Sequence, residues 1–209
     1  MPEARIGETP LTLFEPEVVR GIAARLRVTW LLHRFDERKV WAAFMFINGF
    51  VTIGLLSLVA LATGTPFVFP SLGPTAFLFF FDPRAPSASP HHALLGHAIG
   101  IACGYGALRL LDLQHSGSAL ALGVTGPRVL AAALSLAATG ALMILLKAAH
   151  PPAGATTLII SLGAIVRPRD LVIIEVALAL LVLQAIVINR LAGLDYPLWR
   201  PRAPGRTGR

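Results

Sequence analysis

The sequence predicts an all-α integral membrane protein, and three observations support this fold class. The chain of 209 residues is 55% hydrophobic and only 14% charged, whereas about a quarter of the residues in a soluble domain are charged. The charge is also unevenly distributed, because residues 1–39 and 190–209 hold 12 of the 18 lysines and arginines. Between these ends lie four apolar stretches that are long enough to cross a bilayer.

The four long spans are predicted at residues 40–61, 93–113, 128–149 and 171–189. Two shorter apolar segments, 67–81 and 153–166, lie between them, and each follows a stretch that contains prolines. Because proline lacks an N–H and fixes φ, no helix runs unbroken through these points. We therefore expect two short Pro/Gly-broken helices that are re-entrant or half-spanning. Broken helices at membrane depth persist only where the freed backbone groups face protein, water or a ligand, which makes each break a candidate site.

The order of long span, break, short segment and long span occurs twice, in residues 40–113 and again in 128–189. Both breaks share the pattern P-x-x-G-x-T, at Pro70 to Thr75 and at Pro151 to Thr156. If both short segments cross the membrane, the second half is inverted relative to the first. Paired interrupted helices in such pseudo-repeats point to the binding site of a transporter.

The polar ends predict the domain organisation around this transmembrane domain, residues 40–190. Residues 1–39 form a cytoplasmic segment with a basic amphipathic helix from Pro16 in the membrane interface; a partner-facing helix or a frayed tail is the alternative. Residues 191–209 form a basic cytoplasmic tail. Arginine at both ends places both termini in the cytoplasm, which is compatible with four or six crossings. The expected location is the inner (plasma) membrane of a bacterium.

The arginines also raise the sequence pI to about 11, and a basic chain can bind nucleic acid. Here the arginines flank apolar spans, so their expected partner is the anionic headgroup region of the bilayer. We therefore expect the lipid bilayer as a partner and no nucleic acid.

The residues around the second break resemble those of the HPP family of integral membrane proteins. The resemblance rests on His150-Pro151-Pro152-Ala153-Gly154-Ala155-Thr156, on the run from Pro70 to Ala76, and on Gly96-His97 in a span. It covers roughly residues 36–190. It implies a small membrane domain with four transmembrane helices, and some plant and cyanobacterial members are linked to nitrite transport.

A small anion requires hydrogen-bond donors and a positive potential, and helix N-termini supply both. We expect the N-termini of the two short helices to converge, with glycines that let the backbone approach the ligand. Serine and threonine hydroxyls add donors, and His150 and Lys147, three residues apart, add charge on one helical face. The candidate binding residues are Ser71, Gly73, Thr75, His97, Lys147, His150, Pro151, Pro152, Gly154, Thr156 and Thr157. The alternative is that these residues only cap and pack the short helices.

Two ionisable residues lie inside predicted spans, where such groups are functional candidates. His97 could carry a proton and so support anion–proton symport, or it could bond to a backbone carbonyl. Glu175 could pair with Arg167 or Arg169, extend toward the interface, or act in transport.

Gly96, Gly100 and Gly104 form a ridge of small residues that favours close helix packing. The ridge could lie inside the chain or join two copies as a homo-oligomer. His91, His92 and His97 do not match a known metal-ligand spacing, and no catalytic motif appears, so we expect no metal, no cofactor and no enzyme.

The leading function is therefore a transporter or channel for a small inorganic anion, with nitrite the first candidate. A non-transporting sensor or scaffold module is the alternative, and a membrane enzyme acting on a lipid or quinone is the third.

Overall fold

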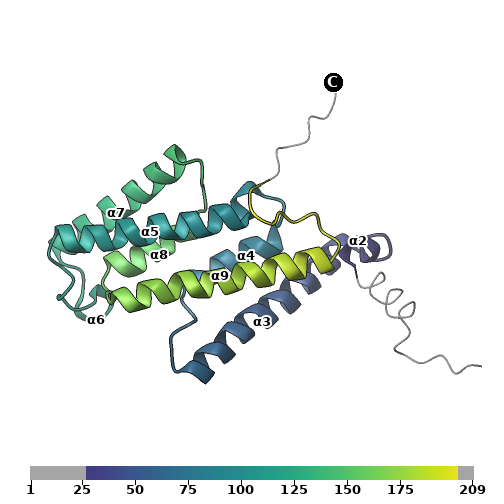
Figure 1. The fold of residues 1–209 in the computed structure, drawn as a ribbon, viewed down its shortest axis with the longest axis horizontal. Coiled ribbons are helices and arrows are strands. Elements are labelled where there is room, and N and C mark those ends of the chain that lie inside the picture. The colour runs from purple at the N-terminus through teal and green to yellow at the C-terminus, as the bar shows by residue number, and fades with distance from the viewer. Residues whose placement is uncertain (1–26, 202–209) are drawn as a thin grey trace, which may run out of the picture.

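The computed structural model describes residues 27–201, and within this range the chain is helical with no β-strand. Figure 1 shows the arrangement of its elements. In chain order they are α2 Val28–Leu31, α3 Glu37–Thr63, α4 Leu72–Phe81, the 3-10 helix η1 Pro86–Ala88, α5 Pro90–Leu110, α6 Ala119–Leu122, α7 Gly126–Leu145, α8 Ala153–Ser161 and α9 Pro168–Leu191. The prediction of an all-α fold is confirmed. Most of the predicted amphipathic helix from Pro16 lies outside the described residues.

The four long helices α3, α5, α7 and α9 are long and apolar enough to cross a membrane, which confirms the four predicted spans. A short helix stands between the long helices of each half, α4 with ten residues and α8 with nine. At 1.5 Å per residue each covers roughly 15 Å, about half of the hydrocarbon core. That the two halves are an inverted repeat stays a prediction.

Helices α5 and α9 run antiparallel along the length of the molecule (Figure 1), and hydrogen bonds join neighbouring segments at both of its ends. At one end the N–H of Ala119 donates to the carbonyl of Leu162, at 2.9 Å, and at the other end the N–H of His91 donates to the carbonyl of Trp199, at 3.0 Å. Helix α3 packs on α4 and α9, whereas α7 packs on α5 and α8. The short helices thus occupy the space between the long ones, with α8 on the left of the view and α4 near its middle (Figure 1).

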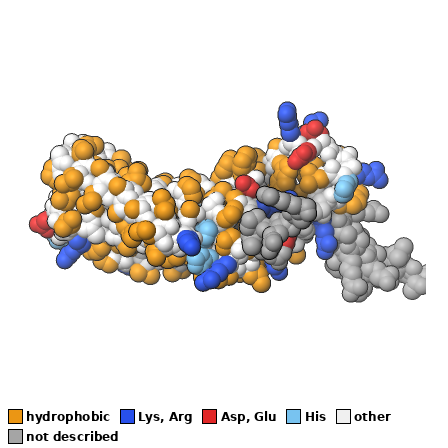
Figure 2. Space-filling view, turned by 90° about the horizontal axis from the view of Figure 1, so that it is seen from above, with side chains coloured by type: hydrophobic (Ala, Val, Ile, Leu, Met, Phe, Trp, Pro, Cys, Tyr) orange, Lys and Arg blue, Asp and Glu red, His pale blue; other side chains and the backbone are white. Residues whose placement is uncertain are grey.

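The outer surface fits a lipid environment. Large apolar side chains on the long helices are exposed, among them Phe46, Leu110, Ile144 and Leu183. Hydrophobic side chains cover the body of the molecule in Figure 2, and most charged side chains gather toward its ends. Contiguous apolar surface of this kind is unusual on a soluble monomer, so the exposed faces of the long helices lie in the bilayer. The chain is an integral membrane protein.

Helix α7 ends earlier than the predicted span 128–149. Lys147 has a φ of 52°, its N–H donates to the carbonyl of Ile144, and the N–H of Ala148 donates to that of Met143. These two bonds form a Schellman motif, which closes a helix around a left-handed residue. The helix therefore ends at Leu145, before the prolines. Lys147 is exposed and, like His150, lies outside the helix, so the prediction that the two share a helical face is wrong.

The segment after α9 is anchored to the rest of the structure. Tyr196 is fully buried, its hydroxyl donates to the carbonyl of Ala88, and its own carbonyl accepts from Nε of Arg190. Burial also raises the pKa of the Tyr196 hydroxyl, which therefore stays a donor at physiological pH. Residues 192–201 are thus part of the packed structure, whereas the sequence predicts a tail from residue 191.

Replacing Tyr196 with phenylalanine is expected to lower the free energy of unfolding by about 1 kcal/mol, because one buried hydrogen bond is lost and the Ala88 carbonyl is left without its donor. Thermal unfolding of the purified protein in detergent measures this. Trp199→Phe changes an exposed aromatic side chain in the same segment. This variant is the control, and its midpoint of thermal unfolding should equal that of the wild type. An unchanged midpoint for Tyr196→Phe would show that the bond does not anchor the segment.

Candidate functional site

The N-termini of the two short helices meet at one side chain of α5. Thr75, in the first turn of α4, places its Oγ1 3.0 Å from Nε2 of His97. Thr156, in the first turn of α8, places its Oγ1 2.8 Å from Nδ1 of the same ring. The convergence predicted from the paired P-x-x-G-x-T patterns is therefore present, and His97 lies between the two helices.

His150, in the connection from α7 to α8, adds a second imidazole. Its Nε2 lies 3.2 Å from Oγ1 of Thr75, and its Nδ1 lies 2.7 Å from the carbonyl oxygen of Ser87. The ring centroids of His97 and His150 are 5.2 Å apart. We call Thr75, His97, His150 and Thr156 the His–Thr cluster. All four are completely buried, and the cluster joins α4, α5 and α8 with hydrogen bonds to both rings.

The glycine ridge of α5 makes this approach possible. A Cβ on Gly96 would lie 2.7 Å from Cβ of His150, and a Cβ on Gly100 would lie 2.9 Å from the carbonyl oxygen of Ala153. A Cβ on Gly104 would lie 2.8 Å from the carbonyl oxygen of Thr157. The ridge therefore packs against α8 and the His150 connection inside the chain. Because the three glycines are buried there, the structure agrees with the first of the two predicted alternatives, a ridge that packs inside the chain.

The two remaining hydroxyl candidates differ in their surroundings. Thr157 turns toward α7, where its Oγ1 lies 2.9 Å from Oγ1 of Thr139, so it does not contact the His–Thr cluster. Ser71 precedes α4 and is completely buried, and its Oγ has no hydrogen-bond partner within the described residues. A buried hydroxyl without a hydrogen-bond partner lowers the stability of the fold, because its lost hydration is not replaced. Ser71 thus offers an unused donor at the N-terminus of α4.

The glycines of the two breaks do not line the cluster. Gly73 is exposed and has open space around it, and Gly154 is half-buried against Leu136. The N–H groups of Ala153 and Gly154 donate back to the carbonyls of His150 and Pro151 in tight turns. The predicted close approach of ligand to free backbone N–H groups at α8 is therefore absent, and the donors near the cluster are side chains.

A pocket lies beside the His150 end of the cluster, lined by the neighbours of Thr75 and His150 in the chain. It has a volume of about 440 Å³ and is lined by Pro74, Phe77, Leu78, Ser87, Pro151, Pro152 and Ala155. Ser87, whose carbonyl accepts from Nδ1 of His150, thus belongs to an accessible wall. A backbone carbonyl is present at every position of a chain, so the sequence alone does not identify this residue.

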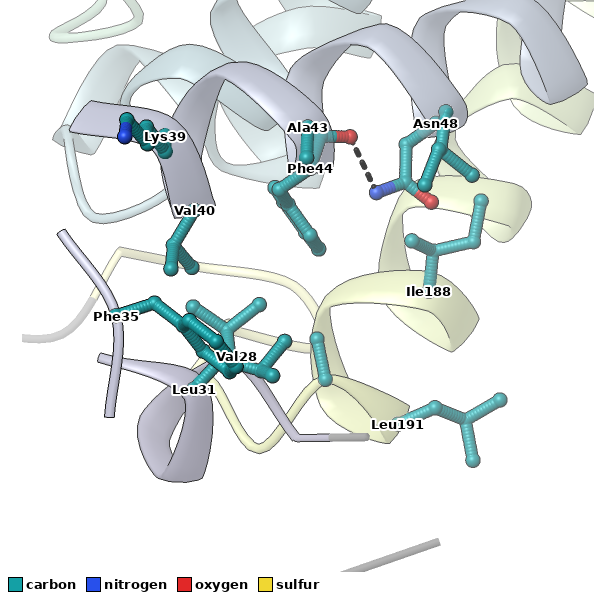
Figure 3. A pocket seen from close by; sticks show the side chains of 12 residues that line it. Val28, Leu31, Phe35, Lys39, Val40, Ala43, Phe44, Asn48, Ile188 and Leu191 are labelled. Atoms are coloured by element: carbon teal, nitrogen blue, oxygen red, sulfur yellow. Dashed lines mark hydrogen bonds between the residues drawn. The ribbon is translucent and has the colours of Figure 1, made fainter. Parts of the chain in front are cut away.

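A larger pocket lies elsewhere, between α2, the start of α3 and the end of α9, with a volume of about 700 Å³. Figure 3 shows that apolar side chains such as Val40, Phe44 and Leu191 line it. The amide of Asn48 donates to the carbonyl of Phe44, at 2.7 Å. This lining has few groups that could replace the water around a small anion, so we do not assign the site there.

Glu175, the other ionisable candidate in a span, forms no hydrogen bond with the His–Thr cluster. Oε1 of Glu175 is buried and has no hydrogen-bond partner, and within residues 27–201 it forms no ion pair with Arg167 or Arg169. In that same range no three His, Cys, Asp or Glu side chains are grouped so that they could hold a metal ion.

Fold and site together define an integral membrane protein in which two half-length helices meet through their N-termini at a buried histidine pair. Residues 35–197 match the family described as HPP, transmembrane region, and the chain belongs to this family. A transmembrane protein of Dictyostelium discoideum is 30% identical over 173 residues, covering 79% of this chain and 52% of that protein. This chain therefore spans about half the length of that relative. No solved structure matches the chain.

Proposed function

We propose that the protein is a membrane transporter or channel for a small inorganic anion, with nitrite the first candidate and with no catalytic role. The observation that carries the proposal is the meeting of the N-termini of α4 and α8 at His97. Each N-terminus carries roughly half a positive charge from its helix macrodipole. Two such ends directed at one point inside a bilayer favour an anion and oppose a cation.

The donors around this point support the same conclusion. The hydroxyl of Ser71 is buried and unused, and the hydroxyls of Thr75 and Thr156 already lie at the imidazole of His97. An anion that leaves water needs such groups to replace its hydration. The link of some plant and cyanobacterial members of the family to nitrite makes nitrite the first anion to test. The arginines at both ends of the sequence support an orientation with both termini in the cytoplasm.

A non-transporting membrane module that senses or acts as a scaffold is the competing function. The observation that favours it is the complete burial of the His–Thr cluster, because a conducting state must open a path to these residues. Transport therefore predicts a second conformation, whereas a scaffold needs none.

Nitrite uptake into proteoliposomes of the purified protein separates the two functions. Chloride, nitrate and sulfate serve as competitors, and protein-free liposomes report the leak of nitrous acid. Saturable nitrite uptake above that leak supports transport. Absence of flux for all four anions would favour the scaffold.

Replacing both Pro151 and Pro152 with alanine is expected to reduce uptake by at least about tenfold, or ~1.4 kcal/mol in binding terms. The two prolines have no N–H and lie at the start of α8, so their loss lets the connection adopt other backbone conformations. Initial uptake rates measure the effect. Pro168→Ala, at the start of α9 and away from the cluster, is the matched control. Full activity of the double variant would show that the break does not form the site.

A further inference from the structure

The hydrogen bonds of the His–Thr cluster favour one set of proton positions on the two rings. Nδ1 of His150 lies 2.7 Å from the carbonyl oxygen of Ser87. A carbonyl oxygen only accepts, so Nδ1 of His150 carries a hydrogen. In the neutral ring Nε2 is then an acceptor, and it faces Oγ1 of Thr75 at 3.2 Å. The Thr75 hydroxyl has two acceptors for its one hydrogen, this nitrogen and the carbonyl oxygen of Ser71, each at 3.2 Å. In the arrangement that pairs every ring nitrogen, the hydroxyl of Thr75 donates to His150.

The tautomer of His97 follows from that of His150 in this arrangement. Thr75 has a single hydroxyl hydrogen, so toward His97 it accepts, and Nε2 of His97 carries the hydrogen at 3.0 Å. Nδ1 of neutral His97 then accepts from the hydroxyl of Thr156, at 2.8 Å. The four bonds run in one direction, from Thr156 through His97, Thr75 and His150 to the Ser87 carbonyl. In this arrangement one carbonyl group at the end of the chain thus determines the tautomers of both histidines.

Thr75 also has a second acceptor for its hydrogen. Its Oγ1 lies 3.2 Å from the carbonyl oxygen of Ser71. When a proton is added at Nε2 of His150, that nitrogen becomes a donor to Thr75. The Thr75 hydroxyl then accepts from both rings on its two lone pairs and turns its hydrogen to Ser71. The cluster can therefore bind one proton by rotating one hydroxyl, without leaving a donor of either ring unpaired.

The groups around the rings do not supply a fixed countercharge. From the elements packed against them, α4 presents Thr75, α8 presents Thr156, and η1 presents the carbonyl of Ser87. His92 is the other titratable side chain that interacts electrostatically with His150. Helix α7 has no titratable residue after Arg128, α3 has none after Lys39, and Glu175 of α9 forms no hydrogen bond through Oε1. Within residues 27–201, no carboxylate bonds to either ring.

From this geometry we propose that the His–Thr cluster binds one proton together with the anion, so that the two cross the membrane as a neutral pair. The proposal rests on the proposed transport of an anion. An isolated charge at membrane depth is costly, whereas an imidazolium beside an anion is compensated. Each ligand therefore favours binding of the other by the same factor, because linkage is reciprocal.

The first test determines the tautomers of His97 and His150 and does not depend on transport. The nitrogen NMR spectrum of the full chain in lipid, labelled with nitrogen-15 at histidine, distinguishes the protonated from the bare nitrogen in each ring. At pH 8 we expect His150 to carry its hydrogen on Nδ1 and His97 on Nε2, with the His150→Gln and His97→Gln variants providing the assignments. The opposite tautomer at His150 would overturn the proposal.

The second test measures protons taken up when nitrite binds to the purified protein in weakly buffered detergent solution at pH 7. We expect the wild type to take up about one proton for each nitrite bound. Thr75→Ser keeps the hydroxyl and should keep the uptake. Thr75→Val removes the hydroxyl and should lower the number of protons taken up per nitrite at least about threefold. Thr139→Val is the matched control, because this buried hydroxyl bonds to Ser135 and Thr157 and to neither ring.

The outcomes separate this inference from the proposed function. Nitrite binding or flux with no proton uptake overturns the proton pairing and leaves anion transport intact. No binding or flux of nitrite, nitrate or chloride overturns both. Equal proton uptake by the wild type and Thr75→Val would also overturn the role of the cluster, because the proton would then bind elsewhere.

Discussion

Gly100→Val is expected to destabilise the protein by about 3 kcal/mol, the upper end of the range for overpacking a core. A Cβ at position 100 would lie 2.8 Å from Oγ1 of Thr157 and 2.9 Å from the carbonyl oxygen of Ala153. The carbonyl belongs to the backbone of α8 and cannot rotate away, so α5 and α8 must separate. This movement would also stretch the bond from His97 on α5 to Thr156 on α8. Thermal unfolding in detergent measures the loss, and we expect nitrite uptake to be lost with it.

Gly106→Val is the matched control for this prediction. Gly106 lies on α5 six residues further along and is exposed, and a Cβ at this position would meet no atom within 4 Å. Both substitutions place a β-branched residue in the same helix, so the difference between them isolates the contact with α8. Equal melting temperatures for the two variants would show that the ridge does not hold α8 in place.

The spans could be predicted from the sequence because hydropathy over about 20 residues is a property of composition. The predicted stretch 40–61 lies within α3 and 171–189 lies within α9. The end of α7 could not be predicted in the same way. It depends on the left-handed conformation of Lys147, and a lysine in an apolar segment gives no signal for that conformation.

The site could be predicted in part. The paired patterns placed Thr75 and Thr156 at helix N-termini, and the structure joins both to His97. The predicted roles of the glycines differ from those in the structure, because Gly73 faces outward and Gly100, in the ridge of α5, makes the close approach to α8. Which face of a short helix is buried depends on its neighbours, and a ten-residue apolar helix has no polar face to reveal it.

Arg128, at the start of α7, is another residue whose surroundings could not be predicted from the sequence. It lies at the edge of a predicted span, where a side chain directed to the interface is expected. In the structure it is 2% exposed. Its guanidinium donates to the carbonyls of Leu113, Ser116, Gly117 and Ser161, at 2.7–3.2 Å. Arg128 thus ties the connection between α5 and α6 to the end of α8.

Arg128→Met is therefore expected to cost roughly 3 kcal/mol or more, because buried carbonyls lose their donor and each acceptor left unsatisfied costs about 1–3 kcal/mol. A cation in the first turn of a helix is disfavoured by the macrodipole, so the four carbonyls must account for its position. The space is also closed, since a Cβ on Gly163 would lie 2.6 Å from a guanidinium nitrogen of Arg128. Arg128→Lys should recover only part of the loss, because a compact ammonium has three donors and no planar fork.

Unfolding of the purified variants in detergent tests this prediction, with Arg109→Met as the control. Arg109 lies near the end of α5, is exposed, and forms no hydrogen bond through its side chain among the described residues. Removing its charge should leave the free energy of unfolding within about 0.5 kcal/mol of the wild type. If Arg128→Met and Arg109→Met unfolded at the same temperature, the four carbonyls would have hydrogen-bond donors without the guanidinium. The ordering of the α5–α6 connection would then have to come from the contact of Ala119 with Leu162 alone.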